Sequence, residues 1–254
     1  MQWAKQMGLI AEATSSLSHA AADEIFGRAT YCGLGDRRTV ALTFDDGPSP
    51  GSVEIARYLE AAGIRATFFQ CGANVLRHPE IARDLFAAGH EIGNHTFSHR
   101  RLCPRIGWKM NFLSSETIYR EFARTQDVIT YHTGAVATLL RPPYGLRWLG
   151  LGDAQRRLGL TGIMWTVIAH DWEWDAEVVT EHVVRGASPG GILCLHDGRD
   201  TRANPDVSVT LACVKRIVPR LREMGYGFET VSDIVRRRVE QENEVIPALG
   251  CAVL

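Results

Sequence analysis

Two adjacent carboxylates, Asp45 and Asp46, directly follow the apolar run 39–44. Neighbouring ionised carboxylates repel each other, so keeping both charged beside a protein core requires a metal ion or another cation. The alternative is a tight turn followed by a helix cap, because Asp, Gly, Pro and Ser all favour turns. On this segment alone the two interpretations weigh about equally.

Two histidines, His95 and His99, stand four residues apart. On one helical turn this spacing would place both imidazoles on the same face, which is a common two-point grip on a metal. Alone, the pattern is more often one surface and one core histidine. With Asp46 as a third ligand, the set becomes two histidines and one carboxylate, with one position left open for water. His90 and Glu91 lie just upstream, and we assign them to a strand or to outer contacts of the site.

The run Arg-Pro-Pro-Tyr-Gly at 141–145 places an always-charged guanidinium beside two prolines that fix the backbone. Arg141 could pair with a carboxylate and hold it ionised. The alternative, a rigid turn with a surface arginine, is the commoner meaning of such a run by itself.

Asp171-Trp172 and His196-Asp197 are two further polar pairs. An aspartate beside a histidine can keep the imidazole protonated, which would make His196 a general acid. The alternatives are a core aromatic at Trp172 and a capping histidine at position 196.

Alternating β-branched runs and amphipathic segments predict the elements that must position these groups. Strands are expected at 39–44, 66–70, 90–93, 139–140, 162–168, 191–196 and 228–231, and helices at 12–26, 53–62, 79–88, 114–131, 176–185 and 209–224. Strand–helix alternation repeated about seven times predicts an α/β fold, a distorted (β/α) barrel with about seven parallel strands; an open doubly wound sheet is the alternative. In both folds chemistry gathers at the carboxyl ends of the strands, and each polar cluster follows an apolar run.

Composition excludes several classes of protein. The 254 residues carry 28 basic and 29 acidic side chains, a net charge of −1 that argues against a protein built to grip nucleic acid. No apolar run approaches the roughly 20 residues of a membrane span, and the start of the chain shows no secretory signal. We therefore expect a cytoplasmic protein as the chain stands, or a secreted or periplasmic one if a leader has been removed. The six cysteines form no CxxC pair, so neither a disulfide framework nor a zinc ribbon is indicated.

Together the segments resemble the polysaccharide deacetylase family, carbohydrate esterase family 4, also called the NodB homology domain. The resemblance rests on Thr-Phe-Asp-Asp-Gly-Pro-Ser at 43–49, His-Thr-x-x-His at 95–99, Arg-x-Pro-Tyr at 141–144, Asp-Trp at 171–172 and Leu-His-Asp at 195–197. It covers about residues 31–234. Residues 1–30 are expected to form a helical extension, 31–240 the catalytic domain and 241–254 a tail.

The resemblance implies a role for each matched residue. Asp46, His95 and His99 would bind a divalent metal, most often zinc, with cobalt, nickel or manganese as other possibilities. The remaining roles would be a general base at Asp45, its partner at Arg141, a general acid at His196, a carboxylate tuning that acid at Asp171, a backbone donor to the oxyanion at Tyr144 and an acetyl-pocket wall at Trp172.

Three positions depart from the family pattern. Ile168 stands where the family often has a second aspartate, three residues before Asp-Trp. Residues 104–112 look like an insertion, and Trp108 within it could stack on sugar, although a small satellite core is slightly favoured there. Cys194 replaces the usual aliphatic residue two positions before His196, and strand alternation predicts that it lines the acyl pocket.

The expected function is removal of N-acetyl groups from N-acetylglucosamine-containing poly- or oligosaccharides of chitooligosaccharide or peptidoglycan type. The alternatives are an O-acetyl carbohydrate esterase, a hydrolase of non-sugar amides, and a catalytically silent carbohydrate-binding module on the same fold. The expected partner is an acetylated glycan, with no nucleic acid and no membrane span; the oligomeric state is left open.

Overall fold

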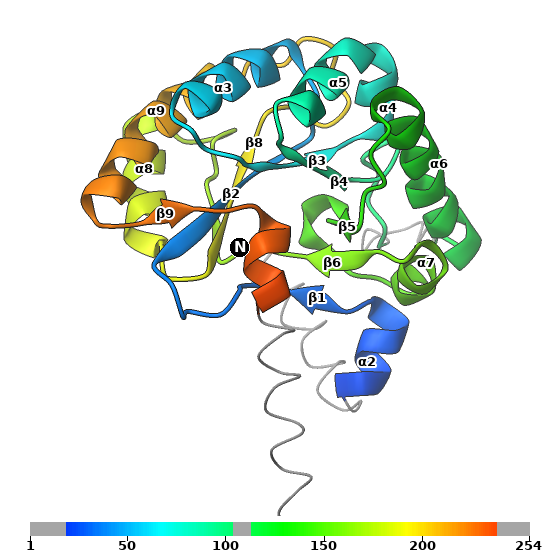
Figure 1. The fold of residues 1–254 in the computed structure, drawn as a ribbon. Coiled ribbons are helices and arrows are strands. Elements are labelled where there is room, and N and C mark those ends of the chain that lie inside the picture. Colours follow the sequence, from blue (N-terminus) through cyan, green and yellow to red (C-terminus); the bar gives the residue numbers. More distant parts are fainter. Residues whose placement is uncertain (1–18, 104–112, 238–254) are drawn as a thin grey trace, which may run out of the picture.

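A computed structural model describes residues 19–103 and 113–237 of the chain (Figure 1). Trp108 and the rest of the predicted insertion lie outside these residues. Nine strands are present in the described part: β1 (Ala29–Thr30), β2 (Thr39–Asp45), β3 (Thr67–Gln70), β4 (Glu91–Asn94), β5 (Leu139–Leu140), β6 (Thr161–Ile163), β7 (Val167–Ile168), β8 (Gly191–His196) and β9 (Gly227–Phe228). Eight helices accompany them: α2 (His19–Phe26), α3 (Pro50–Ala61), α4 (Gly72–Arg77), α5 (Pro79–Ala87), α6 (Ser115–Thr133), α7 (Leu151–Leu158), α8 (Ala176–Gly186) and α9 (Ser208–Glu223).

The strands form one sheet in the order β1-β6-β5-β4-β3-β2-β8-β7, and β9 pairs with the first residues of β2. Every pairing between these strands is parallel. Figure 1 shows the sheet curled on itself with helices around its outside. The predicted α/β barrel architecture is therefore confirmed as a curled half-barrel, whose edge strands β1 and β7 do not pair with each other among the described strands.

Strand β2 is the centre of the fold. Its first residue is half-buried and the six that follow are buried, because it pairs with β8 on one side and with β9 and then β3 on the other. Its outward-facing apolar residues join the main core beneath α3, α5, α8 and α9. A strand buried on both faces reads as a continuous apolar run, and β2 presents its polar end only at Asp45.

The predicted single strand over 162–168 is wrong. The run is divided into β6 and β7, which lie at opposite ends of the sheet order. Residues 164–166 cross the open side of the half-barrel: the amide of Met164 donates to the carbonyl of Thr30 at the end of β1, and that of Thr166 donates to the carbonyl of Ile192 on β8. A short apolar run cannot reveal such a crossing, because both halves need the same residue types.

The expected helices after residue 30 are present, with ends shifted by up to three residues. Ser114 caps α6 as predicted, since its hydroxyl accepts the amide of Thr117. Sequence reasoning missed α4, α7, the two-residue strand β1 and a 3-10 turn at Pro143–Gly145. Within the described residues no helix is both long and apolar enough to span a membrane.

Candidate metal centre and active site

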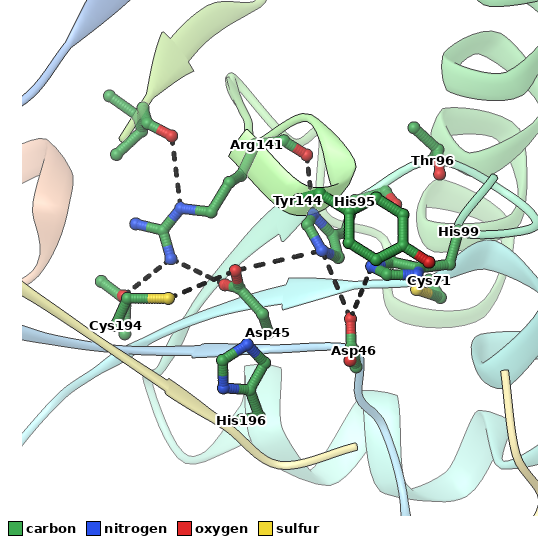
Figure 2. Close-up of polar contacts among 12 residues, drawn as sticks. Asp45, Asp46, Cys71, His95, Thr96, His99, Arg141, Tyr144, Cys194 and His196 are labelled. Atoms are coloured by element: carbon green, nitrogen blue, oxygen red, sulfur yellow. Dashed lines mark hydrogen bonds and ion pairs between the residues drawn. The ribbon is translucent and has the colours of Figure 1, made fainter. Parts of the chain in front are cut away.

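The polar clusters predicted from five strand exits meet at one end of the half-barrel. Figure 2 shows four of these clusters: Asp45 and Asp46, His95 and His99, Arg141 with Tyr144, and His196. Asp45 and His196 are the last residues of β2 and β8 and are partners in the strand register. The loops after β4, β5 and β7 bring His95, Arg141 and Asp171 to the same end. The carboxyl ends of parallel strands share one edge of a sheet, which is why residues as much as 154 positions apart converge here.

Asp46, His95 and His99 form a candidate ligand triad, and all three are buried. Oδ1 of Asp46 lies 3.3 Å from Nε2 of His95 and 3.0 Å from Nε2 of His99, and it accepts no well-aligned hydrogen bond. Ligand atoms 2.0–2.2 Å from one tetrahedral ion stand roughly 3.3–3.6 Å apart. The donor set and its spacing therefore fit a divalent cation.

A second contact on each ring orients the two imidazoles. Nδ1 of His95 lies 2.7 Å from the carbonyl oxygen of Arg141. Since a carbonyl only accepts hydrogen bonds, Nδ1 carries the proton, and the lone pair of Nε2 is free to bind a metal. Nδ1 of His99 lies 2.7 Å from Oδ1 of Asp200. Such outer partners fix the ring orientation of metal-binding histidines.

Asp200 is a residue that sequence reasoning missed. It lies in the loop after β8, and its amide donates to Oδ2 of Asp46 at 2.9 Å. The available signal was the run His-Asp-Gly-Arg-Asp at 196–200, which places a third acidic or imidazole group just beyond a strand exit. Tyr144 lies close by, with its ring centroid 4.8 Å from that of His99 and its hydroxyl 3.3 Å from Oδ1 of Asp200.

The charges of the triad are strongly coupled. Burial raises the pKa of Asp46, but His95 and His99 outweigh this and hold the value well below its ordinary range. Burial lowers the pKa of His99, yet Asp200 and Asp46 outweigh that effect and raise the value to about 10. Without a metal, His99 therefore stays protonated between the carboxylates of Asp46 and Asp200. A bound cation would take the place of the positive charge on His99.

The helical turn expected for His95–His99 is wrong. Residues 95–99 form an irregular loop in which Thr96 has φ 67° and His99 has φ 52°. Left-handed backbone in non-glycine residues is strained, and it swings His99 back towards Asp46. The four-residue spacing correctly indicated that the two imidazoles lie close together, but a bent loop brings them together, not a helical turn.

Asp45 is held by a fully buried arginine. Nη1 of Arg141 lies 2.6 Å from Oδ1 of Asp45 and 2.8 Å from the hydroxyl of Thr43. Its other nitrogens donate to the carbonyl of Ile163, at the end of β6, and to that of Met164, in the crossing segment described above. All of these partners accept hydrogen bonds, so the buried guanidinium is satisfied and its positive charge lies directly against the Asp45 carboxylate.

His196 is oriented by Asp171 on the opposite side of Asp45. Nδ1 of His196 lies 2.8 Å from Oδ1 of Asp171, whose Oδ2 accepts the His196 amide and the hydroxyl of Thr210. Burial lowers the pKa of His196, but Asp171 outweighs it and the value lies above its ordinary range. His196 therefore tends to stay protonated, with Nε2 free to face the site.

The other sequence-predicted residues line the same region. Trp172 is 46% exposed, with its ring centroid 4.8 Å from that of His196, so it stands at the rim. Cys194 is buried on β8, and its thiol donates to Oδ2 of Asp45 at 3.4 Å. Strand alternation holds, since Leu193 and Leu195 pack in the main core.

Two other acidic residues near the motifs have structural contacts. Glu91 begins β4 at the far end of the sheet and accepts hydrogen bonds from Thr67 and the amide of Ser232. Asp197 is fully buried and accepts the hydroxyl of Ser52. Burial raises the pKa of Asp197 to about 7, and its contact with Ser52 ties the first turn of α3 to the loop after β8.

Comparison with known proteins agrees with this geometry. The sequence model described as polysaccharide deacetylase matches residues 33–163, slightly more than half of the chain. The chain belongs to the polysaccharide deacetylase family. Its half-barrel and the buried Asp-His-His triad are consistent with the divalent metal of that family.

Two curated family members illustrate the range of named substrates. A peptidoglycan-N-acetylglucosamine deacetylase of Listeria monocytogenes is 30% identical over 80% of this chain. A chitooligosaccharide deacetylase of Azorhizobium caulinodans is 31% identical over 76% of this chain and 93% of its own length. The chain spans 40% of the length of the Listeria protein, so the comparison concerns one part of that relative.

Among solved structures, a mutant of a family 4 carbohydrate esterase pseudoenzyme with restored enzymatic activity matches with a TM-score of 0.71. It is 25% identical, and the match covers 81% of this chain and 70% of that one. Because a pseudoenzyme shares this fold, the fold alone does not establish catalysis. The chemistry must be argued from the side chains of the site.

Proposed function

We propose that this protein is a metal-dependent deacetylase that removes N-acetyl groups from N-acetylglucosamine-containing poly- or oligosaccharides of chitooligosaccharide or peptidoglycan type. One observation carries the proposal: Asp45 lies between the ligand triad and His196, and its Oδ1 is paired with the buried guanidinium of Arg141. A base, an acid and a metal site in one pocket are the groups that amide hydrolysis requires.

Asp46, His95 and His99 would hold the cation, and zinc suits their donor set best. When bound, a divalent cation supplies Lewis acidity, which polarises a carbonyl oxygen and acidifies a water molecule beside it. Asp45 lies beside this ligand triad, since its Oδ2 is 3.9 Å from Nε2 of His95. The acidified water would therefore lie next to a carboxylate that can accept its proton.

The proton transfers then divide between two residues. Asp45 accepts a proton from the attacking water through its carboxylate, while Arg141 remains on the other oxygen. His196 delivers the proton on Nε2 to the sugar nitrogen as the C–N bond breaks, and Asp171 stabilises the imidazolium until that moment. The products are acetate and a free amino sugar, so atoms and charge balance.

The exposed rim favours a sugar substrate. Trp172, beside His196, is 46% exposed, and Tyr144, beside His99, is 45% exposed. Aromatic rings combine a large apolar face with a polar edge, which suits contact with a pyranose. We assign Trp172 to the wall of the acetyl pocket and the backbone of Tyr144 to the developing oxyanion.

Acetate release by the purified full chain tests the proposal. The substrates are N-acetylated chitooligosaccharides, peptidoglycan and O-acetylated xylan, each with and without a chelator. We expect acetate and new amines from one of the first two, loss on chelation, and recovery with Zn²⁺ or Co²⁺. Acetate from xylan alone would make the protein an O-acetyl esterase. No acetate from any substrate by metal-loaded protein would favour the silent binding module.

A further inference from the structure

A second group of potential metal ligands lies beside the triad. Within the described residues, the ligand atoms of Asp45, Cys194 and His196 lie within 4.8 Å of one another. Figure 2 shows Cys194 beside Asp45 on the side away from Asp46, with His196 also adjacent to Asp45. The sulfur is available only because cysteine occupies this position of β8.

Each of the three side chains has one donor atom left free by its other contacts. Arg141 occupies Oδ1 of Asp45, which leaves Oδ2 to face Cys194. Asp171 occupies Nδ1 of His196, which leaves Nε2. One carboxylate oxygen, one imidazole nitrogen and one sulfur form a mixed set of the kind that borderline-soft cations prefer.

The spacing of the sulfur and the carboxylate oxygen suits such a cation. Sγ of Cys194 and Oδ2 of Asp45 stand 3.4 Å apart. In a tetrahedral site with Zn–S near 2.3 Å and Zn–O near 2.0–2.2 Å, the two ligands stand roughly 3.5 Å apart. The thiol–carboxylate contact is therefore already close to the separation that a shared ion would require.

Charge sets the affinity of this group below that of the triad. Burial raises the pKa of the Cys194 thiol well above its ordinary value, so a cation must displace a proton held tightly by sulfur. The Arg141 guanidinium is also close, on the other oxygen of Asp45. Coordinated thiols nevertheless lose their proton to the metal, and Asp45 and Asp171 supply negative charge around the group.

We propose that Asp45, Cys194 and His196 form a second, weaker site for a thiophilic divalent cation such as Zn²⁺, Co²⁺ or Cd²⁺. Binding breaks the S–H bond of Cys194 and, where His196 is an imidazolium, its Nε2–H bond; the protons pass to solvent. An occupied second site withholds Asp45 and His196 from proton transfer. That consequence, inhibition by excess metal, rests on the proposed function, whereas the binding itself does not.

Cobalt titration of the metal-free full chain tests the site without any substrate. Co²⁺ bound to thiolate gives a near-ultraviolet charge-transfer band that carboxylate and imidazole ligands lack. We expect the first equivalent to bind without this band and the second to produce it. Cys194→Ala and the closer mimic Cys194→Ser should abolish the band and leave one equivalent bound.

Two matched variants control for two of the three other buried thiols among the described residues. Cys213→Ala removes a buried cysteine on α9 whose thiol contacts the carbonyl of Ala176, and Cys71→Ala removes one beside the triad. Both should retain the band. Its absence from the wild-type protein, its appearance with the first equivalent, its persistence in a folded Cys194 variant, or its loss in either control would overturn the proposal.

The inhibitory consequence has a separate readout. In the active protein, the ratio of acetate release at excess Zn²⁺ to that at one equivalent should be low for wild type and near one for Cys194→Ser. Using the ratio removes any effect of the substitution on basal turnover. A charge-transfer band in a protein that releases no acetate would support the second site and refute the proposed function, so the two failures are distinguishable.

Discussion

The two sides of the site are built on different kinds of backbone. On the proton-transfer side, Asp45 and His196 occupy the last regular positions of two paired strands. On the metal side, Asp46, His99 and Asp200 have left-handed backbone, with φ values of 74°, 52° and 50°. Each such non-glycine residue carries strain of about 1–3 kcal/mol, which the surrounding contacts must offset.

Asn74 on α4 provides one such contact. Its side-chain amide donates to the carbonyls of Asp46 and Asp200 at 2.6 and 2.9 Å, so it clamps two strained residues from different loops. Asp45 and His196 need no comparable side-chain contact, because the backbone hydrogen bonds between β2 and β8 set their separation. We therefore expect changes on the proton-transfer side to affect chemistry, and changes on the metal side to affect ion affinity as well.

The sharpest test of this division exchanges neighbouring carboxylates for amides. Asp45→Asn should keep its metal but lose roughly 10²–10⁴-fold in turnover, because an amide cannot accept the proton. Asp46→Asn should lose metal and turnover together. Acetate release and metal analysis of both variants measure the effect, and retained activity in Asp45→Asn would place the base on another residue.

Removing an imidazole breaks the metal side directly. His95→Ala should lower metal affinity by more than the roughly 10–100-fold that loss of an outer partner costs. Metal content after dialysis should fall in parallel with activity. His132→Ala, at the end of α6 and away from the site, is the control. Full metal occupancy with normal turnover in His95→Ala would show that the ligand assignment is wrong.

A smaller effect on metal affinity is expected at Asp200, which contacts the ligand His99. Asp200→Asn should weaken metal binding by roughly 10–100-fold, because Nδ1 of His99 loses its charged partner. Competition with a chelator of known affinity gives the ratio. Asp206→Asn, in the same loop, where the side chain accepts the amide of Ser208, should bind metal normally. Equal affinities in the two variants would mean that Asp200 does not position His99.

The mildest change concerns pH. Asp171 raises the pKa of His196, so Asp171→Asn should lower that pKa and deprotonate the acid at lower pH. The alkaline limb of kcat/KM should therefore move to lower pH while metal content stays constant. Glu173→Gln removes the same charge from an exposed position nearby and should leave the limb in place. An unmoved limb in Asp171→Asn would remove His196 from the role of acid.

How much of this arrangement the sequence predicts differs between the two sides. Asp45 and His196 end apolar runs, so strand periodicity alone places them at one edge of a parallel sheet. The geometry of His99 depends on a left-handed bend, and Asp200 on a loop closing over it; neither leaves a periodic signal. The split of 162–168 is likewise invisible in composition, because it arises from which strands the two halves meet.

The long separation in sequence between β2 and β8 also affects the order in which the site is completed during synthesis. His99 precedes His196 by 97 residues. At about 5–20 residues per second, a ribosome completes the triad some 5–20 s before the acid and the Asp200 loop exist. During synthesis the chain can therefore present metal ligands before it has the means to transfer protons. The half-barrel gains its last central strand, β8, only after that interval.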